Sequence, residues 1–329
     1  MIAWQRFVEI VRSHQRFVLT THVRPDGDAL GCELAMAATL DALGKDVRVC
    51  NAFAVPQNLQ PLDPQQRLKQ LAVDVSAEEL ADREVLIILD TSAWAQLGAM
   101  ADVIRNSRAI KAVIDHHLSG DDLGAELFKD TEAEAAGRLV VEAADALGVP
   151  LSPAIARPAF VALATDTGWF RFHSTTAETL RLAARLVDAG ATPHALYKQL
   201  YENDTHARLR LIGRAISHSQ IEFGGRLIYT WLEQADFAET GALASDSEDI
   251  INMTLSVGGT EVAVILVEQR SGGFKISLRS RSRLDCSQIA QLFGGGGHRR
   301  AAGALISEPL ESARERILGA VREAMTKEE

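Results

Sequence analysis

Short apolar runs alternate with longer amphipathic stretches through the first part of the chain. Four runs rich in β-branched residues predict strands, at 16–21, 46–50, 84–89 and 110–114. Apolar residues at helical spacing predict helices, at 29–43, 132–147, 153–165 and 177–189. Strands that alternate with helices indicate βαβ units, so we expect a parallel sheet with helices packed against it.

The pattern changes after residue 192. Residues 193–224 are polar with helical spacing, which indicates a connector. Beyond the connector we expect a helix near 246–255, a Gly-rich loop at 294–297, and strands at 227–232, 262–267 and 274–278. A chain of 329 residues also favours two domains, because single cores stop growing near about 250 to 300 residues.

The predicted fold class is therefore α/β, with two domains joined by a helical linker. The predicted domains are a parallel-sheet catalytic domain at 1–192, the linker at 193–224 and a smaller α/β domain with a mixed sheet at 225–329.

Composition narrows the class of function. The net charge of −10 disfavours a protein that grips long duplex nucleic acid, because that mode rests on many Lys and Arg contacts to phosphates. No apolar run approaches the roughly 18 residues that span a bilayer, so we expect no membrane segment and a cytoplasmic location. Three widely spaced cysteines argue against a disulfide framework and a zinc knuckle.

A dense group of polar residues follows the first predicted strand. His22, Asp26 and Asp28 lie within seven residues, around a sharp turn at Pro25–Gly27. A mixed nitrogen and oxygen ligand set with open positions suits Mn²⁺ or a similar divalent ion. The alternative is an Asp-rich turn that caps the next helix.

Three further positions extend this group. Asp90 follows five apolar residues, and a carboxylate at a buried strand end must be paired, capped or metal-bound. Asp115, His116 and His117 end the next strand; one imidazole can bind metal while its neighbour faces substrate. Asp166 ends an apolar helix, where an ordinary helix-terminal Asp is the alternative. Ligands of open α/β sheets collect at the carboxyl ends of strands, so these residues should converge.

The set of candidate metal ligands is large enough for two divalent ions. The six candidates are His22, Asp26, Asp28, Asp90, His116 and Asp166. Two-metal sites activate a water and clamp the oxygens of a transferring phosphoryl group, so the set indicates phosphoester hydrolysis.

A second constellation lies in the C-terminal domain. Arg279 ends a predicted strand, and four glycines at 294–297 precede His298, Arg299 and Arg300. Glycine backbone with free N–H groups beside basic side chains forms an anion site that a phosphate fits. A flexible linker is the alternative for the glycines.

These motifs, in this order, resemble the DHH phosphoesterase family with its DHH-associated domain. The matching segments are T-H-x-x-P-D-G-D-A-x-G, L-D-T, D-H-H, T-D-T-G and G-G-G-G-H-x-x-A-A-G. Within the family, the two-lobe length resembles the NrnA type. That resemblance implies an enzyme that cleaves short oligoribonucleotides of about two to five nucleotides and dephosphorylates 3′-phosphoadenosine 5′-phosphate (pAp), with two metal ions, Mn²⁺ preferred and Mg²⁺ as an option.

The resemblance also implies roles for individual residues. His22, Asp26 and Asp90 would hold one metal ion; the second ion's ligands would be Asp28, Asp90, His116 and Asp166. Asp115 would support the histidines, and His117 would contact the scissile phosphate. The substrate-binding set would comprise Arg279, Arg281, Gly295, Gly296, Gly297, His298 and Arg299.

Three other functions remain as alternatives. They are a manganese-dependent pyrophosphatase, a linear or cyclic dinucleotide phosphodiesterase, and an idle nucleotide-binding protein on the same fold. The Gly294–Gly303 motif speaks against the first of these. Cleavage polarity, base preference and oligomeric state are open from the sequence, with a homodimer as one option.

Overall fold

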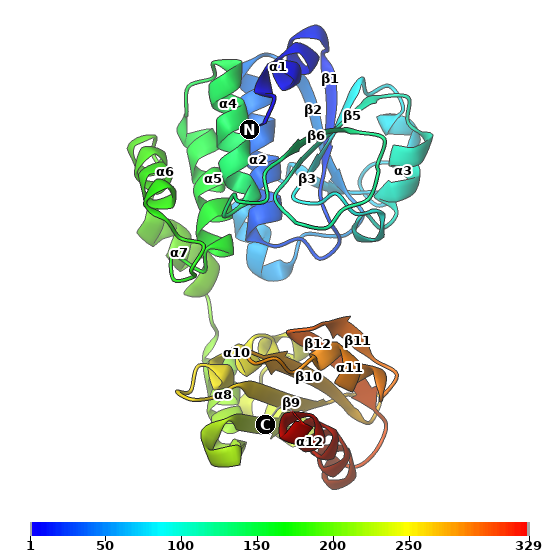
Figure 1. The fold of residues 1–329 in the computed structure, drawn as a ribbon, viewed down its shortest axis with the longest axis vertical. Helices are drawn as coiled ribbons and strands as arrows, with labels where there is room; N and C mark the ends of the chain where they lie inside the picture. Colours follow the sequence, from blue (N-terminus) through cyan, green and yellow to red (C-terminus); the bar gives the residue numbers. More distant parts are fainter. Residues whose placement is uncertain (1, 328–329) are drawn as a thin grey trace. The chain divides into compact units, whose positions relative to one another are not determined.

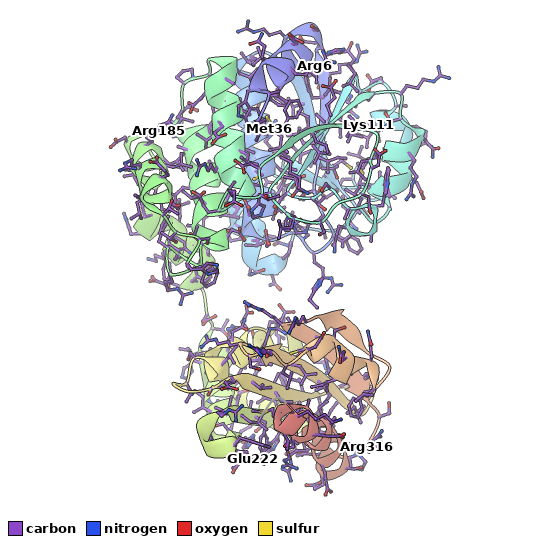
Figure 2. The ribbon with its side chains drawn as sticks, in the orientation of Figure 1. Arg6, Met36, Lys111, Arg185, Glu222 and Arg316 are labelled. Carbon is purple, nitrogen blue, oxygen red and sulfur yellow. The ribbon has the colours of Figure 1, made fainter. Side chains whose placement is uncertain are left out.

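A computed structural model describes residues 2–327 of the chain. The chain divides into two compact units, Met1–Asn203 and Asp204–Glu329, and each unit has its own hydrophobic core. Figure 2 shows Met36 inside the first unit, whereas Arg6 and Arg185 lie at its surface. Within the described residues, no helix has both the length and the apolar character that crossing a membrane requires.

A six-stranded, fully parallel sheet forms the centre of the first unit (Figure 1). From one edge to the other its strands are β3 (Leu68–Gln70), β2 (Asp46–Asn51), β1 (Arg16–Thr20), β4 (Val85–Leu89), β5 (Ile110–Asp115) and β6 (Glu126–Lys129). The chain runs outward from β1 to β3 and then returns to β4 on the other side of β1. The order therefore reverses between β1 and β4, which is where ligands of doubly wound folds bind.

Successive strand residues face opposite sides of this sheet, and both sides are covered. Phe17, Leu19 and Ile87 pack on one face against α1 (Trp4–Ser13), α2 (Gly27–Ala42), α4 (Ala136–Leu147) and α5 (Pro153–Asp166). Val18 and Ile88 pack on the other face against α3 (Met100–Asn106). The unit is completed by α6 (Ala177–Asp188), α7 (Pro193–Tyr201) and the 3₁₀ helices η1 (Gln57–Leu62), η2 (Glu78–Leu80) and η3 (Trp94–Gln96).

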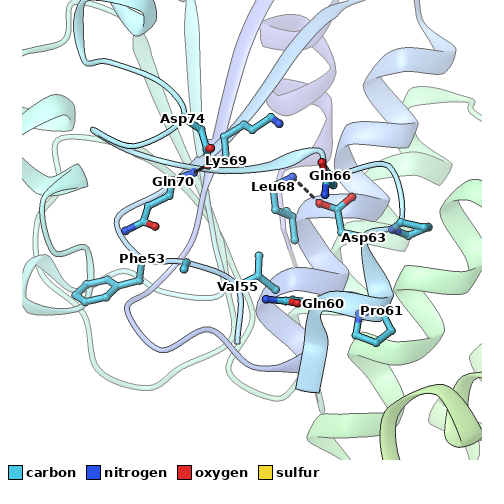
Figure 3. A pocket seen from close by; sticks show the side chains of 12 residues that line it. Phe53, Val55, Gln60, Pro61, Asp63, Gln66, Leu68, Lys69, Gln70 and Asp74 are labelled. Carbon is cyan, nitrogen blue, oxygen red and sulfur yellow. Dashed lines mark hydrogen bonds between the residues drawn. The ribbon is translucent and has the colours of Figure 1, made fainter. Parts of the chain in front are cut away.

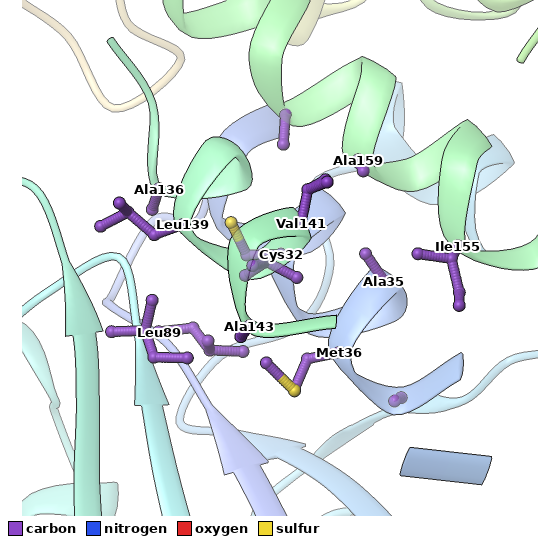
Figure 4. Packing of buried hydrophobic residues seen from close by; sticks show 14 of the residues in the cluster. Cys32, Ala35, Met36, Leu89, Ala136, Leu139, Val141, Ala143, Ile155 and Ala159 are labelled. Atoms are coloured by element: carbon purple, nitrogen blue, oxygen red, sulfur yellow. The ribbon is translucent and has the colours of Figure 1, made fainter. Parts of the chain in front are cut away.

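Small residues let helices α2 and α5 pack closely. A Cβ on Gly31 would lie 2.5 Å from the carbonyl oxygen of Pro158, so only glycine fits there. Figure 4 shows Ala35 and Ala159 in the same layer of buried side chains. Close packing matters for function because α2 begins, and α5 ends, at the residues that the sequence predicts to bind metal.

The second unit holds a separate mixed sheet. Its strands, in order across the sheet, are β11 (Gly296–His298), β12 (Ala301–Ile306), β10 (Phe274–Ser280), β9 (Val262–Glu268), β8 (Leu227–Leu232) and β7 (Gln220–Glu222). Only β8 and β9 pair in parallel. One face packs against α11 (Cys286–Gln291) and α12 (Leu310–Lys327), and the other against α8 (His206–His218) and α10 (Ile250–Leu255). Helix α9 (Gln234–Thr240) and η5 (Ala244–Ser247) complete it.

The predicted fold class, α/β with one parallel and one mixed sheet, is confirmed. Two local expectations differ from the structure. The Gly-rich segment is not a free loop, because Gly296–His298 pairs with Ala301–Gly303 as an antiparallel hairpin. The segment expected as a linker at 193–224 contains α7 in the first unit and α8 in the second, with the division at 203/204.

Candidate metal centre

Three strand ends deliver the central side chains of the site. His22 follows β1, Asp90 follows β4, and His116 follows β5, which are neighbouring strands on either side of the point where the strand order reverses. The Nε2 atoms of His22 and His116 lie 3.4 Å from Asp90 Oδ2 and Oδ1, respectively. One carboxylate therefore stands between two imidazoles.

Asp90 is held in an unusual conformation. Its side chain is 3% exposed and its backbone φ is +59°, a region that costs a non-glycine residue free energy. Its N–H donates to the carbonyl oxygen of Ile114, and its buried Oδ1 accepts no hydrogen bond from the described residues. A buried oxygen without a donor fits a cation as its partner.

Helix ends supply the remaining carboxylates. Asp166 Oδ2 and Asp28 Oδ2 lie 3.6 and 3.8 Å from His116 Nε2. The ligand atoms of Asp28, His116 and Asp166 lie within 4.8 Å of one another, and so do those of His22, Asp26 and Asp90. All six predicted ligands thus gather in one place, in two groups that could each hold an ion, and a third group, Asp90, His116 and His117, shares one residue with each of them.

Both imidazoles are oriented for metal binding by backbone carbonyls. The Nδ1 atom of His22 lies 3.0 Å from the carbonyl oxygen of Val23, and that of His116 lies 3.1 Å from the carbonyl oxygen of Ala133. An Nδ1–H that donates to a carbonyl leaves the Nε2 lone pair free. In both residues, Nε2 is the atom that faces the carboxylates.

Packed carboxylates shift the pKa values of both imidazoles and of Asp166. Burial lowers the pKa of His22 and His116, but the nearby carboxylates outweigh it and raise these values to about 9 and about 10. Burial together with Asp90 raises the pKa of Asp166 to about 6, against the opposing effect of His116. Without cations, the site therefore keeps protons that a divalent ion would displace.

Asp26 and Asp28 also cap helices, as the alternative interpretation expected. Asp26 Oδ1 accepts hydrogen bonds from the N–H groups of Asp28 and Ala29, at the start of α2. Asp28 accepts from the N–H groups of Ala136 and Gly137, at the start of α4. These bonds fix both carboxylates in position, so capping and metal binding are compatible here.

Asp115 and His117 form a pair at the edge of the cluster, where His117 Nδ1 also lies 3.7 Å from Asp90 Oδ1. Asp115 is fully buried, and its Oδ1 lies 2.8 Å from His117 Nδ1, whereas the His117 side chain is 52% exposed. The contact with Asp115 raises the pKa of His117. Ser92 Oγ donates a hydrogen bond to Asp115 Oδ2 at 2.6 Å, and Lys129 Nζ forms an ion pair with the same oxygen at 3.0 Å. Asp115 therefore fixes the Nδ1 side of the His117 ring, while about half of the side chain is exposed to solvent.

The second unit places its predicted residues at one end of its sheet. Arg279 is opposite Ala301, and Ala301 is opposite His298, so the three residues share a face across β10, β12 and β11. His298 is exposed and Arg279 is half-buried. Gly295 and Gly297 approach β12 so closely that a Cβ would lie 2.1 and 2.6 Å from its carbonyl oxygens.

The other two predicted arginines, Arg281 and Arg299, form hydrogen bonds to backbone carbonyl groups elsewhere in the second unit. Arg281 is exposed, and its N–H donates to the carbonyl oxygen of Glu261. Arg299 donates from Nη2 to the carbonyl oxygen of Arg283 at 2.9 Å.

Comparison with known proteins identifies the family. The family model "DHH family, N-terminal domain" matches residues 16–163, and the "DHHA1 domain" model matches residues 224–327. A bifunctional oligoribonuclease and PAP phosphatase NrnA from Thermus thermophilus is 35% identical, over 94% of this chain and 90% of that protein. This chain belongs to the DHH family. The Bacillus subtilis protein of the same name is 26% identical to the DHH-family chain, over 91% of it and 92% of that protein.

Solved structures agree with the fold of this DHH-family chain. An exopolyphosphatase-related protein from Bacteroides fragilis superposes with a TM-score of 0.88 at 26% identity, covering 97% of this chain and 95% of that one. Exonuclease RecJ bound to manganese has a TM-score of 0.55 at 14% identity, covering 97% and 94%, which shows a shared fold alone.

Sequence reasoning missed several polar residues around the DHH-family site. Lys129 ends the edge strand β6, and no motif marks it as a partner of Asp115. Asn51 accepts from the Thr21 N–H at 3.0 Å and donates to the buried carboxylate of Glu33 at 2.8 Å. Burial raises the pKa of Glu33 to about 8. The sequence did offer one signal for Asn51: it is a polar residue at the carboxyl end of β2, and β2 pairs with β1, the strand that precedes His22.

Proposed function

We propose that this DHH-family hydrolase cleaves short oligoribonucleotides to mononucleotides and dephosphorylates pAp to AMP. The relatives' printed names support both activities, and the chain spans about nine-tenths of those relatives. The convergence of His22, Asp90 and His116 at 3.4 Å carries the chemical part of the proposal. A cage of carboxylates and imidazoles at a parallel-sheet switch point suits metal-assisted hydrolysis.

Two divalent ions are the proposed cofactors, Mn²⁺ with Mg²⁺ as an option. The ligands of one would be His22, Asp26 and Asp90, and those of the other Asp28, Asp90, His116 and Asp166. Such ions supply an activated water and stabilise negative charge on phosphoryl oxygens. Asp90 Oδ1, which accepts no hydrogen bond from the described residues, and the two Nε2 atoms that face the two oxygens of this carboxylate support Asp90 as the shared ligand.

His117 is the proposed general acid, and Asp115 is its positioning residue. Asp115 fixes His117 Nδ1 and favours the protonated ring, so the exposed Nε2–H can donate its proton to the oxygen that leaves phosphorus. The proton would return from solvent after product release, because His117 is half exposed.

Residues of the second unit are proposed to bind the rest of the substrate. Arg279 and His298 share one face of its sheet, and a Cβ on the neighbouring Gly296 would meet no described atom within 4 Å. Cationic side chains of this kind pair with phosphate oxygens. Arg281, Arg299 and the backbone of 295–297 complete the proposed set, with short RNA and pAp as the ligands.

A product-resolved assay tests the proposed function. Purified protein with Mn²⁺ would be given pAp, di- to pentanucleotides, a cyclic dinucleotide and pyrophosphate, with an Asp90→Ala variant as the inactive control. We expect AMP from pAp and mononucleotides from the linear oligonucleotides, with pyrophosphate the poorest substrate. Faster phosphate release from pyrophosphate than from pAp would overturn the proposal in favour of a pyrophosphatase.

A further inference from the structure

A pocket lies beside the edge strand β3 of the first unit, outside the metal cluster. Its volume is about 560 Å³, within the roughly 300 to 1,000 Å³ range of small-molecule sites. Figure 3 shows Phe53 and Gln70 toward one end and Gln60 and Gln66 toward the other. The lining combines one exposed aromatic ring with several side-chain amides.

The metal centre is a near neighbour of this pocket. A Cβ placed on Gly98 would lie 3.0 Å from both the Phe53 ring and the Val23 side chain, so both border the same spot. Val23 directly follows His22, and its carbonyl oxygen orients the His22 imidazole. The Phe53 end of the pocket therefore adjoins the loop that carries a predicted metal ligand.

The pairing of β2 with β3 provides a second connection between the pocket and the loop that carries His22. Gln70 lies opposite Asn51 in the pairing of β2 with β3. The side chain of Asn51 in turn accepts a hydrogen bond from the N–H of Thr21, the residue before His22. Two independent sets of contacts thus connect the lining of the pocket to the loop that carries His22.

The acids and the amides that line the pocket differ in whether their side chains make hydrogen bonds, and Lys69 adds a cation to the lining. Asp63 accepts from the N–H groups of Arg67 and Leu68, and Asp74 accepts from the N–H of Gln70, so both carboxylates are used to fold the loop. The side-chain amides that line the pocket have no hydrogen-bond partner among residues 2–327; they belong to Gln60, Gln66 and Gln70. Phe53 is 49% exposed.

We propose that this pocket binds a nucleobase of the substrate, with the base stacked on Phe53 and its edge read by the Gln70 amide. A flat ring beside free amides matches the two ways in which proteins hold unpaired bases, namely stacking and hydrogen bonds to base edges. The adjacent metal centre would hold the phosphate attached to that nucleoside. This inference rests on the proposed function and adds a site of base recognition to it.

Phe53→Ala is the decisive variant. The substrates would be the dinucleotide ApA and its two analogues in which one nucleoside is an abasic riboside. Loss of a stacking partner should raise KM for ApA about tenfold and leave kcat within about twofold. The effect should vanish on the one analogue that lacks the stacked base, and Gln70→Ala should raise KM about threefold.

Matched variants separate stacking from folding. Phe53→Tyr keeps the ring and should restore the KM of the wild type, whereas Leu127→Ala, at an exposed apolar residue on the opposite edge of the sheet, should change nothing. An unchanged KM in Phe53→Ala, or an equal loss on ApA and both abasic analogues, would overturn the inference.

A binding measurement keeps this inference distinct from the proposed hydrolysis. If the wild type failed to cleave ApA, the proposed function would fail, but calorimetric titration of ApA in Ca²⁺ would still test the pocket. Weaker ApA binding by Phe53→Ala than by Phe53→Tyr would support it, and equal binding would reject it.

Discussion

The two units of this chain present polar residues at the ends of their sheets in opposite ways. In the first unit, the carboxyl ends of β1, β4 and β5 deliver side chains that contact one another: Asp90 is 3% exposed, and His22 and His116 are each 15% exposed. In the second unit, one end of the sheet, across β10, β12 and β11, carries a half-buried Arg279 and an exposed His298.

Under the proposed function, the first unit would carry out the reaction and the second would bind the rest of the substrate. Buried carboxylates and imidazoles have to be fixed by helix ends and carbonyl groups, because an unmatched charge in the interior is costly. Exposed cations need no such framework, since water solvates them until a phosphate binds. We therefore expect changes in the first unit to act mainly on kcat, and changes in the second unit to act mainly on KM.

Asp90→Asn should have the largest effect. Loss of a residue that merely supports a metal ligand costs about 10- to 100-fold, so loss of a shared ligand should cost more, about a thousandfold in kcat. The measurement is release of phosphate from pAp with Mn²⁺, alongside calorimetric titration of Mn²⁺.

Asparagine suits this position because it tolerates positive φ better than most residues. The metal-free Asp90→Asn protein should therefore still fold, although at pH 7 it should melt below the wild type, because the variant loses the ion pairs that Asp90 makes with His22 and His116. Full activity in the variant would remove Asp90 from the metal centre.

His117→Ala should have the next largest effect, a fall in kcat of about a hundredfold or more, because general acids contribute about 10²- to 10⁴-fold. Its ring is half exposed and pairs with Asp115, so metal affinity should change little. Comparison of pAp with an analogue whose leaving group needs no proton, such as p-nitrophenyl phosphate, checks this role. An equal loss on both substrates would show that His117 acts on the metals or the fold instead.

Lys129→Gln should lower kcat about tenfold, in line with the effect of residues that position others. Lys129 Nζ lies 3.0 Å from Asp115 Oδ2 and donates to Ser92 Oγ at 2.9 Å, so its loss frees the carboxylate that holds His117. The pH profile of kcat should shift as well, and Lys129→Arg should restore much of the rate. A stable variant with an unchanged profile would leave Lys129 with a structural role only.

The sequence predicted the six residues that gather in the cluster and missed the residues that support them, for a physical reason. Ligand types are restricted by chemistry, and strand ends are visible as apolar runs that stop at Asp90 or Asp115. Supports such as Lys129 and Asn51 are ordinary polar residues that become partners only through strand pairing. The glycines at 295–297 were predicted as a loop because a glycine-rich strand has almost no hydrophobic pattern, and its pairing with β12 is a tertiary feature.

Arg279→Ala tests the other side of the comparison. Removal of one phosphate contact should raise KM for a dinucleotide about tenfold, with kcat nearly unchanged, and reduce the salt dependence of KM. Lys275→Ala is the control, because Lys275 is an exposed cation on the same strand but lies away from the His298 end. A fall in kcat with constant KM would show that Arg279 acts in the chemical step, and it would contradict the expectation that residues of the second unit act mainly on KM.

The pH dependence of metal-free stability should give the smallest change, about 2 to 4 °C in Tm. Ion pairing raises the pKa of His22 from 6.5 to about 9, so its stabilising contribution is complete below about pH 6.5 and is lost as pH rises through 9. The Tm difference between wild type and His22→Gln in EDTA should therefore shrink from pH 7 to pH 10. With saturating Mn²⁺ that difference should instead persist, because a bound cation replaces the proton as the partner of Asp90. A difference that is constant with pH in EDTA would mean that His22 is neutral in the folded protein, and the cluster would then hold less charge than its carboxylates require.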